Sequence, residues 1–187
     1  MRTWHKAVPA LAAIGVLVGG CNDAEPATTA QPTTTSPAVT TSTESDANLW
    51  DPCELPESAL SAAGINTSTK ERDVAGVDFE DWKVCGWQDA EKTYSFTAAS
   101  TAYTLADAKA RTDDYTDFTD TTIGPYKAVQ YRPVGASSDL ACYIDIEVAS
   151  GMIDFSVGNR VSAKNPSEPC GEVRRIIEAL VPYLPTA

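Results

Sequence analysis

Five cysteines carry the most definite chemistry in this chain, because a thiol can be acylated, can pair with another thiol or can bind a metal ion. They are Cys21, Cys53, Cys85, Cys142 and Cys170. An odd number cannot all pair within one chain, so at least one of them has another role. The last four are 32, 57 and 28 positions apart, without the closely spaced C-x₂₋₄-C pair typical of zinc sites. We therefore expect no metal site and two disulfides.

Cys21 lies in the sequence context of a lipidation site. Arg2 and Lys6 precede an uncharged, largely apolar stretch from 7 to 20, which is typical of an export signal and too short to span a bilayer. Its end, Val18-Gly19-Gly20-Cys21, resembles the bacterial lipobox, in which the signal is cut before a cysteine that becomes acylated. We predict a lipoprotein signal peptide over residues 1–20 and a lipid anchor at Cys21 on the outer face of the cell membrane. The alternative is an ordinary cleavable signal with a cysteine nearby.

Cleavage before Cys21 would also remove His5, the only histidine. A chain without histidine has no Ser-His or Cys-His nucleophile and no imidazole base. The sequence also lacks G-x-S-x-G, S-x-x-K, P-loop and G-x-G-x-x-G motifs. We therefore expect no enzymatic activity and no cofactor, and carboxylates are the remaining groups that could do chemistry.

Two carboxylates are predicted to face each other in a hairpin near the C-terminus. A two-residue turn at 150–151 places Ile146 opposite Phe155, with the other apolar residues of both strands on the same face. The same register places Glu147 opposite Asp154 on the other face. Like charges directly opposed are destabilising unless they are solvated or balanced by a neighbour such as Arg132. The alternative is a site at Glu147 and Asp154 for a cation or a polar ligand.

A second acidic feature is the segment 111–120, which contains Asp113, Asp114, Asp117 and Asp120. It lacks the D-x-D-x-D-G spacing and the distal glutamate of a calcium loop. We expect these four carboxylates to be solvated.

The elements that position these residues begin with a short helix over 56–63. A first hairpin follows, with strands 83–88 and 93–100 and Gln88 paired with Thr93. Next come a helix capped by Thr104, a strand over 127–132, the second hairpin and a final helix capped by Ser167. This order, α-β-β-α-β-β-β-α, predicts an α+β fold with a single antiparallel sheet of about five strands and helices packed on one face.

The disulfide pairing follows from these elements only as a preference. Four cysteines allow three pairings. Cys142 and the final helix's Cys170 both face inward, as does Cys85, while Cys53 directly precedes the first helix. We favour Cys53–Cys85 and Cys142–Cys170.

Several aromatic residues exceed what the hairpins need for their packing. They are Trp82, Tyr103, Tyr115, Phe118 and Tyr126. Such residues either pack in the core or line a groove between a helix and the sheet. The sequence leaves both alternatives open.

Charge and composition narrow the range of partners. The formal charge of −12 becomes −14 when the signal leaves, since the signal removes two of the 14 basic side chains and none of the 26 acidic ones. An acidic chain without a basic cluster favours neither nucleic acid nor anionic lipid as a partner. Residues 21–48, rich in Thr, Ser, Pro and Ala, predict a disordered tether, and 49–187 has the length of one globular, disulfide-stapled domain.

Four short features together resemble one known family. They are the lipobox, the Thr/Ser/Pro tether, the motifs DPCEL at 51–55 and CGW at 85–87, and a late strand cysteine followed by a cysteine in the last helix. The chain is similar in these to the actinobacterial cell-envelope lipoproteins grouped as domain of unknown function 3558. The resemblance implies an extracytoplasmic lipoprotein, and no activity is assigned to that family.

The expected function is therefore that of a lipid-anchored, non-catalytic module that binds a partner protein or a small envelope ligand. A carrier of a lipid or other apolar molecule, held in a cavity between sheet and helices, is the alternative, and an enzyme that uses only carboxylates is the third. A closed apolar cavity would favour the carrier, and a filled core with exposed aromatic residues would favour the binding module.

Overall fold

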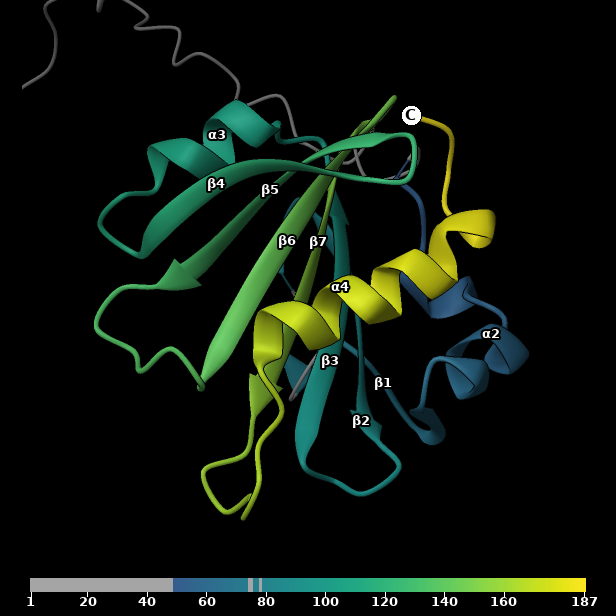
Figure 1. Cartoon of the computed structure of the whole chain (residues 1–187). Helices are drawn as coiled ribbons and strands as arrows, with labels where there is room; N and C mark the ends of the chain where they lie inside the picture. Colours follow the sequence, from purple (N-terminus) through teal and green to yellow (C-terminus); the bar gives the residue numbers. More distant parts are fainter. Residues whose placement is uncertain (1–48, 74–75, 78) are drawn as a thin grey trace, which may run out of the picture. The chain divides into compact units, whose positions relative to one another are not determined.

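Seven antiparallel strands form one sheet in the order β1-β2-β3-β7-β6-β5-β4 (Figure 1). The structure is a computed structural model that describes residues 49–73, 76–77 and 79–187. The predicted signal peptide, Cys21 and the tether lie outside the described residues. The strands are β1 (Ile65–Arg72), β2 (Trp82–Asp89), β3 (Tyr94–Thr101), β4 (Tyr115–Ile123), β5 (Tyr126–Pro133), β6 (Ala141–Val148) and β7 (Gly151–Asn159).

Helices lie on both faces of this sheet. The helical segments are η1 (Pro52–Glu54), α2 (Glu57–Ala62), α3 (Leu105–Ala110), α4 (Pro169–Leu180) and η3 (Val181–Tyr183). The longest helix, α4, crosses the sheet over β6 and β7 (Figure 1). The short helix α3 contacts β6 on the opposite face, where its Ala108 and Arg111 lie beside Asp154. The predicted α+β class is confirmed, whereas the prediction of about five strands with all helices on one face is wrong.

The core lies between α4 and the sheet. Apolar residues of α4 recur at the helical spacing and are fully buried against alternate residues of β6 and β7. On the helix they are Val173, Ile176, Ile177 and Leu180, and on the strands Ile144, Ile146, Ile153, Phe155 and Val157. The face that carries these residues is called the α4 face below, and the opposite one the α3 face.

The hairpin of β6 and β7 differs from its predicted register by two residues. Ile146 pairs with Ile153, and Phe155 pairs with Ile144, so the two-residue turn is 149–150. Gly151 belongs to the strand and has a φ of 135°. Glycine is required at this position because a Cβ would lie 2.2 Å from the carbonyl oxygen of Thr101. A shift of two keeps every apolar side chain on its predicted face and changes only the partner of each residue.

The first hairpin is also displaced by two residues from the prediction. Gln88 pairs with Ser95, and Trp87 pairs with Phe96. The carboxylate of Asp89 accepts hydrogen bonds from the backbone N–H groups of Thr93 at 2.6 Å and Tyr94 at 2.9 Å. The loop closed by these bonds is longer than the predicted one, so each residue of β2 pairs two positions further along β3.

Two strands at the sheet edges are absent from the prediction. β1 and β4 are largely exposed, and both pair irregularly, with shifts between Asn66 and Glu71 and between Thr116 and Thr119. These bulges break the alternation of apolar and polar residues that marks a strand in sequence. The four aspartates of segment 111–120 are exposed, as predicted, and two of them belong to β4.

Both favoured disulfides are present. Cys53–Cys85 joins η1 to β2, and Cys142–Cys170 joins β6 to α4. Each bridge closes a loop of about thirty residues, which contributes on the order of 3–4 kcal/mol in the chain-entropy description. The bridges therefore fix helical segments to the sheet at two separate places.

The cap of α4 is Glu168, and the prediction of Ser167 is wrong. The Glu168 carboxylate accepts from the backbone N–H groups of Cys170 and Gly171, while the Ser167 hydroxyl is buried without a partner. Arg132 donates to Glu168 at 2.7 Å. This places Arg132 at the start of α4, so it does not balance the hairpin carboxylates.

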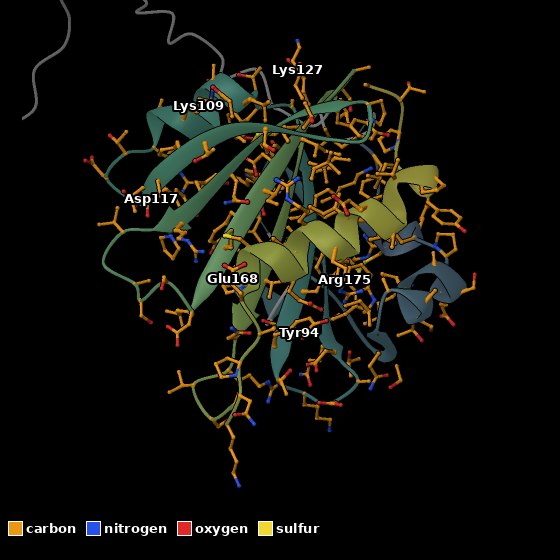
Figure 2. The ribbon with its side chains drawn as sticks, viewed as in Figure 1. Tyr94, Lys109, Asp117, Lys127, Glu168 and Arg175 are labelled. Carbon is orange, nitrogen blue, oxygen red and sulfur yellow. A yellow bond between two sulfur atoms is a disulfide. The ribbon has the colours of Figure 1, made fainter. Side chains whose placement is uncertain are left out.

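A polar group on α4 ties the helix to β3. The Tyr94 hydroxyl donates to Glu172 at 2.8 Å, and Arg175 donates to the same carboxylate. Figure 2 shows Tyr94 and Arg175 beside α4. The hydrogen bond from Arg175, followed by that from Tyr94, lowers the pKa of Glu172 despite its partial burial.

Candidate binding site

The α3 face of the sheet carries acidic and aromatic side chains where the α4 face carries aliphatic ones. Alternation along the strands places Asp145 of β6, Asp154 of β7 and Tyr131 of β5 on this face. Asp145 pairs directly with Asp154 across the β6–β7 ladder. Asp145 is fully buried, and Asp154 is partly exposed. The sequence thus folds so that two carboxyl groups meet below a depression in the surface.

Tyr131 joins the two carboxyl groups. Its hydroxyl oxygen lies 2.9 Å from Oδ2 of Asp154 and 3.1 Å from each carboxyl oxygen of Asp145. Burial and the two nearby acids raise the pKa of Tyr131, so its hydroxyl stays protonated and donates. The three side chains form the group called the carboxyl pair with Tyr131 below.

The two carboxyl groups of the pair are hard to ionise together. Burial raises the pKa of Asp145 well above its ordinary value, and the charge of Asp154 raises it further. Burial also raises the pKa of Asp154, but hydrogen bonds from Asp145 and Tyr131 favour its ionised form. Two opposed carboxylates in such a place cannot both ionise at low cost. A proton shared by the pair therefore favours Asp145, the more buried of the two.

Two adjoining depressions lie above this pair. The first has a volume of about 360 Å³, and it is lined by Trp82, Tyr103, Asp107, Ala108, Arg111, Tyr131, Met152 and Asp154. The second has about 470 Å³ and shares Trp82, Arg111 and Asp154 with the first. Each volume falls within the range of small-molecule sites.

Aromatic rings form the walls. Trp82 and Tyr103 lie 6.0 Å apart between ring centroids in the first depression. Tyr115 and Tyr143 line the second, with centroids 5.2 Å apart in an edge-to-face arrangement. The guanidinium of Arg111 lies over the ring of Tyr115, 4.8 Å from its centroid. The site therefore combines apolar walls with a few charged groups, as ligand sites do.

The helix α3 brings two charges to the rim. Arg111 at its end is paired with Asp114 at 3.1 Å. Thr104 caps this helix as predicted. It forms a capping box with Asp107, whose carboxylate accepts hydrogen bonds from Thr104, and these bonds lower the pKa of Asp107. Lys109 projects from α3 beside β4 (Figure 2), where it forms an ion pair with Asp120. Of these contacts, the Lys109–Asp120 ion pair links α3 to β4.

The predicted pairing of Glu147 with Asp154 is wrong. Asp154 lies at the site, but Glu147 pairs with Met152 and forms an exposed ion pair with Lys127 at 3.0 Å. The displaced hairpin register is the physical reason. Asp145 occupies the position opposite Asp154 that was predicted for Glu147. The sequence signal for the correct register is Gly151, if that glycine is assigned to the strand instead of the turn.

The two alternatives for the surplus aromatic residues each hold for some of them. Trp82, Tyr103 and Tyr115 line the depressions. Phe118 packs on the ring of Tyr131, with 5.2 Å between centroids. Tyr126 is buried on the α4 face, where its hydroxyl donates to the carbonyl oxygen of Pro185.

Metal ligands do not gather around the carboxyl pair. Among residues 49–73, 76–77 and 79–187, no three His, Cys, Asp or Glu side chains are placed to hold a metal ion. Within that same part of the chain, no helix has the length and apolar character needed to cross a membrane.

Comparison with known proteins gives one match. The family model described as "Protein of unknown function (DUF3558)" matches residues 16–183. No curated protein and no solved structure matches the chain.

Proposed function

We propose that this chain, which belongs to the protein family of unknown function DUF3558, is a lipid-anchored, non-catalytic binding module of an actinobacterial cell envelope. Its ligand is a small envelope molecule that enters the depression of about 360 Å³ on the α3 face. The observation that carries the proposal is the combination of Trp82, Tyr103 and Asp154 around a depression that the protein leaves open.

The packing of the α4 face favours this binding module over a lipid carrier. A carrier needs an apolar cavity between helix and sheet. Residues of α4 and of the strands beneath it, such as Ile146, Phe155 and Ile176, are fully buried against one another in one cluster. The surface that accepts a ligand is thus the α3 face, with its aromatic and polar lining.

The anchoring part of the proposal rests on the N-terminal sequence. The n-region, the short apolar stretch and the lipobox at 18–21 support export and acylation of Cys21. The two disulfides agree with an oxidising compartment outside the cytoplasm. A tether over 21–48 then separates the binding domain from the membrane.

Native mass spectrometry of the protein purified from its own membranes tests both parts together. We expect acyl mass on Cys21 and a retained small molecule. Cys21→Ser is the control for anchoring, since it should leave the domain folded and abolish acylation. A wild-type protein without acyl mass would contradict the anchor. Absence of any retained molecule, combined with no binder in a fragment screen read at the Trp82 and Asp154 backbone signals, would contradict the binding site.

A second candidate function is an enzyme that uses the carboxyl pair. Two adjacent carboxyl groups with raised pKa values, at the edge of a depression, are an arrangement that acid–base catalysts use. Against it, Asp145 is fully buried beneath Asp154 and Tyr131 and does not line the depression. The two functions differ in the fate of the retained molecule. An enzyme would release a changed product, and Asp154→Asn would then retain an intact precursor that wild type lacks.

A further inference from the structure

We infer that the ligand of the α3 face is a small organic cation, with its ammonium group against the ring surfaces that Trp82 and Tyr103 present to the depression and facing the carboxylate of Asp154. This inference rests on the proposed function, because it takes the depression to be a binding site and adds the chemical class of the ligand.

The charges around the first depression are complementary to a cation. Asp154 and Asp107 both line it, and hydrogen bonds from Thr104 lower the pKa of Asp107. The single basic residue among its lining side chains, Arg111, is already paired with Asp114 and lies over the Tyr115 ring. An anion would meet two carboxylates and an engaged guanidinium, so the rim excludes anions and attracts cations.

The aromatic walls also select for a cation. The face of an indole or phenol ring attracts a positive charge, most strongly when the charge is partly removed from water. Arg111 uses the Tyr115 ring in this way within the protein itself. Among the described residues, no Lys or Arg side chain lies over Trp82 or Tyr103. The two rings contact each other, with centroids 6.0 Å apart, and both line the depression. Tyr103 is 45% exposed, so the surface of the pair that faces the depression is open to a cation from solution.

Contacts within the carboxyl pair fix the position of the Asp154 carboxylate. A surface carboxylate is free to turn toward water, but Asp154 is held by Tyr131 at 2.9 Å and by its partner Asp145. An acid that is fixed and partly buried binds a cation with less loss of side-chain freedom than an exposed one. It also gives the ammonium group a defined position at the base of the depression.

Isothermal titration of the mature, acylated protein tests the inference with matched probes. The probes are choline, ethanolamine and 3,3-dimethyl-1-butanol, a neutral molecule with the shape of choline. The detergent is a maltoside, because its headgroup carries no charge. We expect saturable binding of at least one amine and binding of the neutral probe that is weaker by about tenfold or more, the size of a partly desolvated cation–π contact.

Three variants locate the binding. Asp154→Asn and Trp82→Ala should each weaken binding of the amine by about tenfold. Glu147→Gln removes a carboxylate from the same strand pair but outside the depression, so it should leave binding unchanged. Thermal melts and preserved disulfides verify that each variant is folded.

The outcomes separate this inference from the proposed function. Equal binding of choline and its neutral analogue would overturn the cation inference and keep the depression as a binding site. A neutral or anionic molecule retained from native membranes would do the same. No saturable binding of either amine at millimolar concentrations would overturn the inference as well, while the native measurement still decides whether a ligand exists.

Discussion

Asp145 and Asp154 lie directly opposite each other on β6 and β7, and the hydroxyl of Tyr131 is within 3.1 Å of both. In most antiparallel hairpins two acidic residues directly opposite each other would be exposed to water, or one of them would be a different residue. Here one member, Asp145, is fully buried, which opposes its ionisation and raises its pKa. The free energy of unfolding should therefore depend on pH.

Asp145→Asn should increase the free energy of unfolding at pH 7 by on the order of 1 kcal/mol, the size of one such contact. The pKa of Asp145 is raised in the folded state. The folded state therefore binds a proton more tightly than the unfolded chain, and wild-type stability falls as the pH rises above about 3.9, the ordinary aspartate value. The neutral asparagine removes this loss. Urea unfolding between pH 4 and 8 measures it, and a variant that follows the wild-type curve would contradict the shared proton.

Glu172→Gln should show the opposite dependence. Hydrogen bonds from Arg175 and then Tyr94 lower the pKa of Glu172, so its contribution to stability is present above the unfolded glutamate pKa and is lost as the pH falls through the folded one. We expect a loss of about 0.5–1 kcal/mol at pH 7, because Arg175 is half-exposed. The difference from wild type should vanish in acid. A difference that persists at the lowest pH would argue for a packing effect.

Glu168→Ala should destabilise the protein by about 1 kcal/mol, the usual effect of removing a helix N-cap. Ser167→Ala is the matched control, because that hydroxyl is buried without a partner and its loss should leave the melting temperature unchanged or slightly higher. The two thermal melts decide which residue caps α4. Equal destabilisation by both substitutions would contradict the assignment of the cap to Glu168.

Gly151→Ala should destabilise the protein by about 2 kcal/mol or more, since its Cβ would collide with the backbone at Thr101 and its φ is positive. Gly158→Ala, on the same strand, offers a control. A Cβ there meets only the Ser95 side chain at 3.6 Å. Denaturant unfolding of both variants gives the comparison, and tolerance of alanine at 151 would return that residue to the turn.

The sequence predicts the faces of this protein better than its registers. The side-chain period of two assigned Ile144, Ile146 and Phe155 to the core, and a shift of two residues preserves that assignment. Cys85 and Cys142 stay on the core side under the same shift, so the favoured disulfide pairing was not affected by it. The residue opposite each carboxylate depends on the register, so after the same shift Asp145, and not Glu147, lies opposite Asp154.

The parts that the sequence did not reveal are set by contacts between distant segments. Gly151 is required in the strand by the end of β3, and a hairpin considered alone contains no such information. The edge strands β1 and β4 are bulged and exposed, so they lack the alternation that identifies a strand. The depression needs α3, β2, β5 and β7 together. Aromatic residues in excess of the core were its only trace in the sequence.

The two disulfides have a consequence for the order in which the chain can be assembled. The loop closed by Cys53 and Cys85 ends before the loop closed by Cys142 and Cys170 begins. A chain that leaves a membrane channel with its N-terminus first can oxidise the first pair while the second pair is still being synthesised. Of the four cysteines that form disulfides, the first two to emerge are then already native partners. Non-overlapping bridges therefore let a secreted chain reach its final connectivity without exchange between mispaired cysteines.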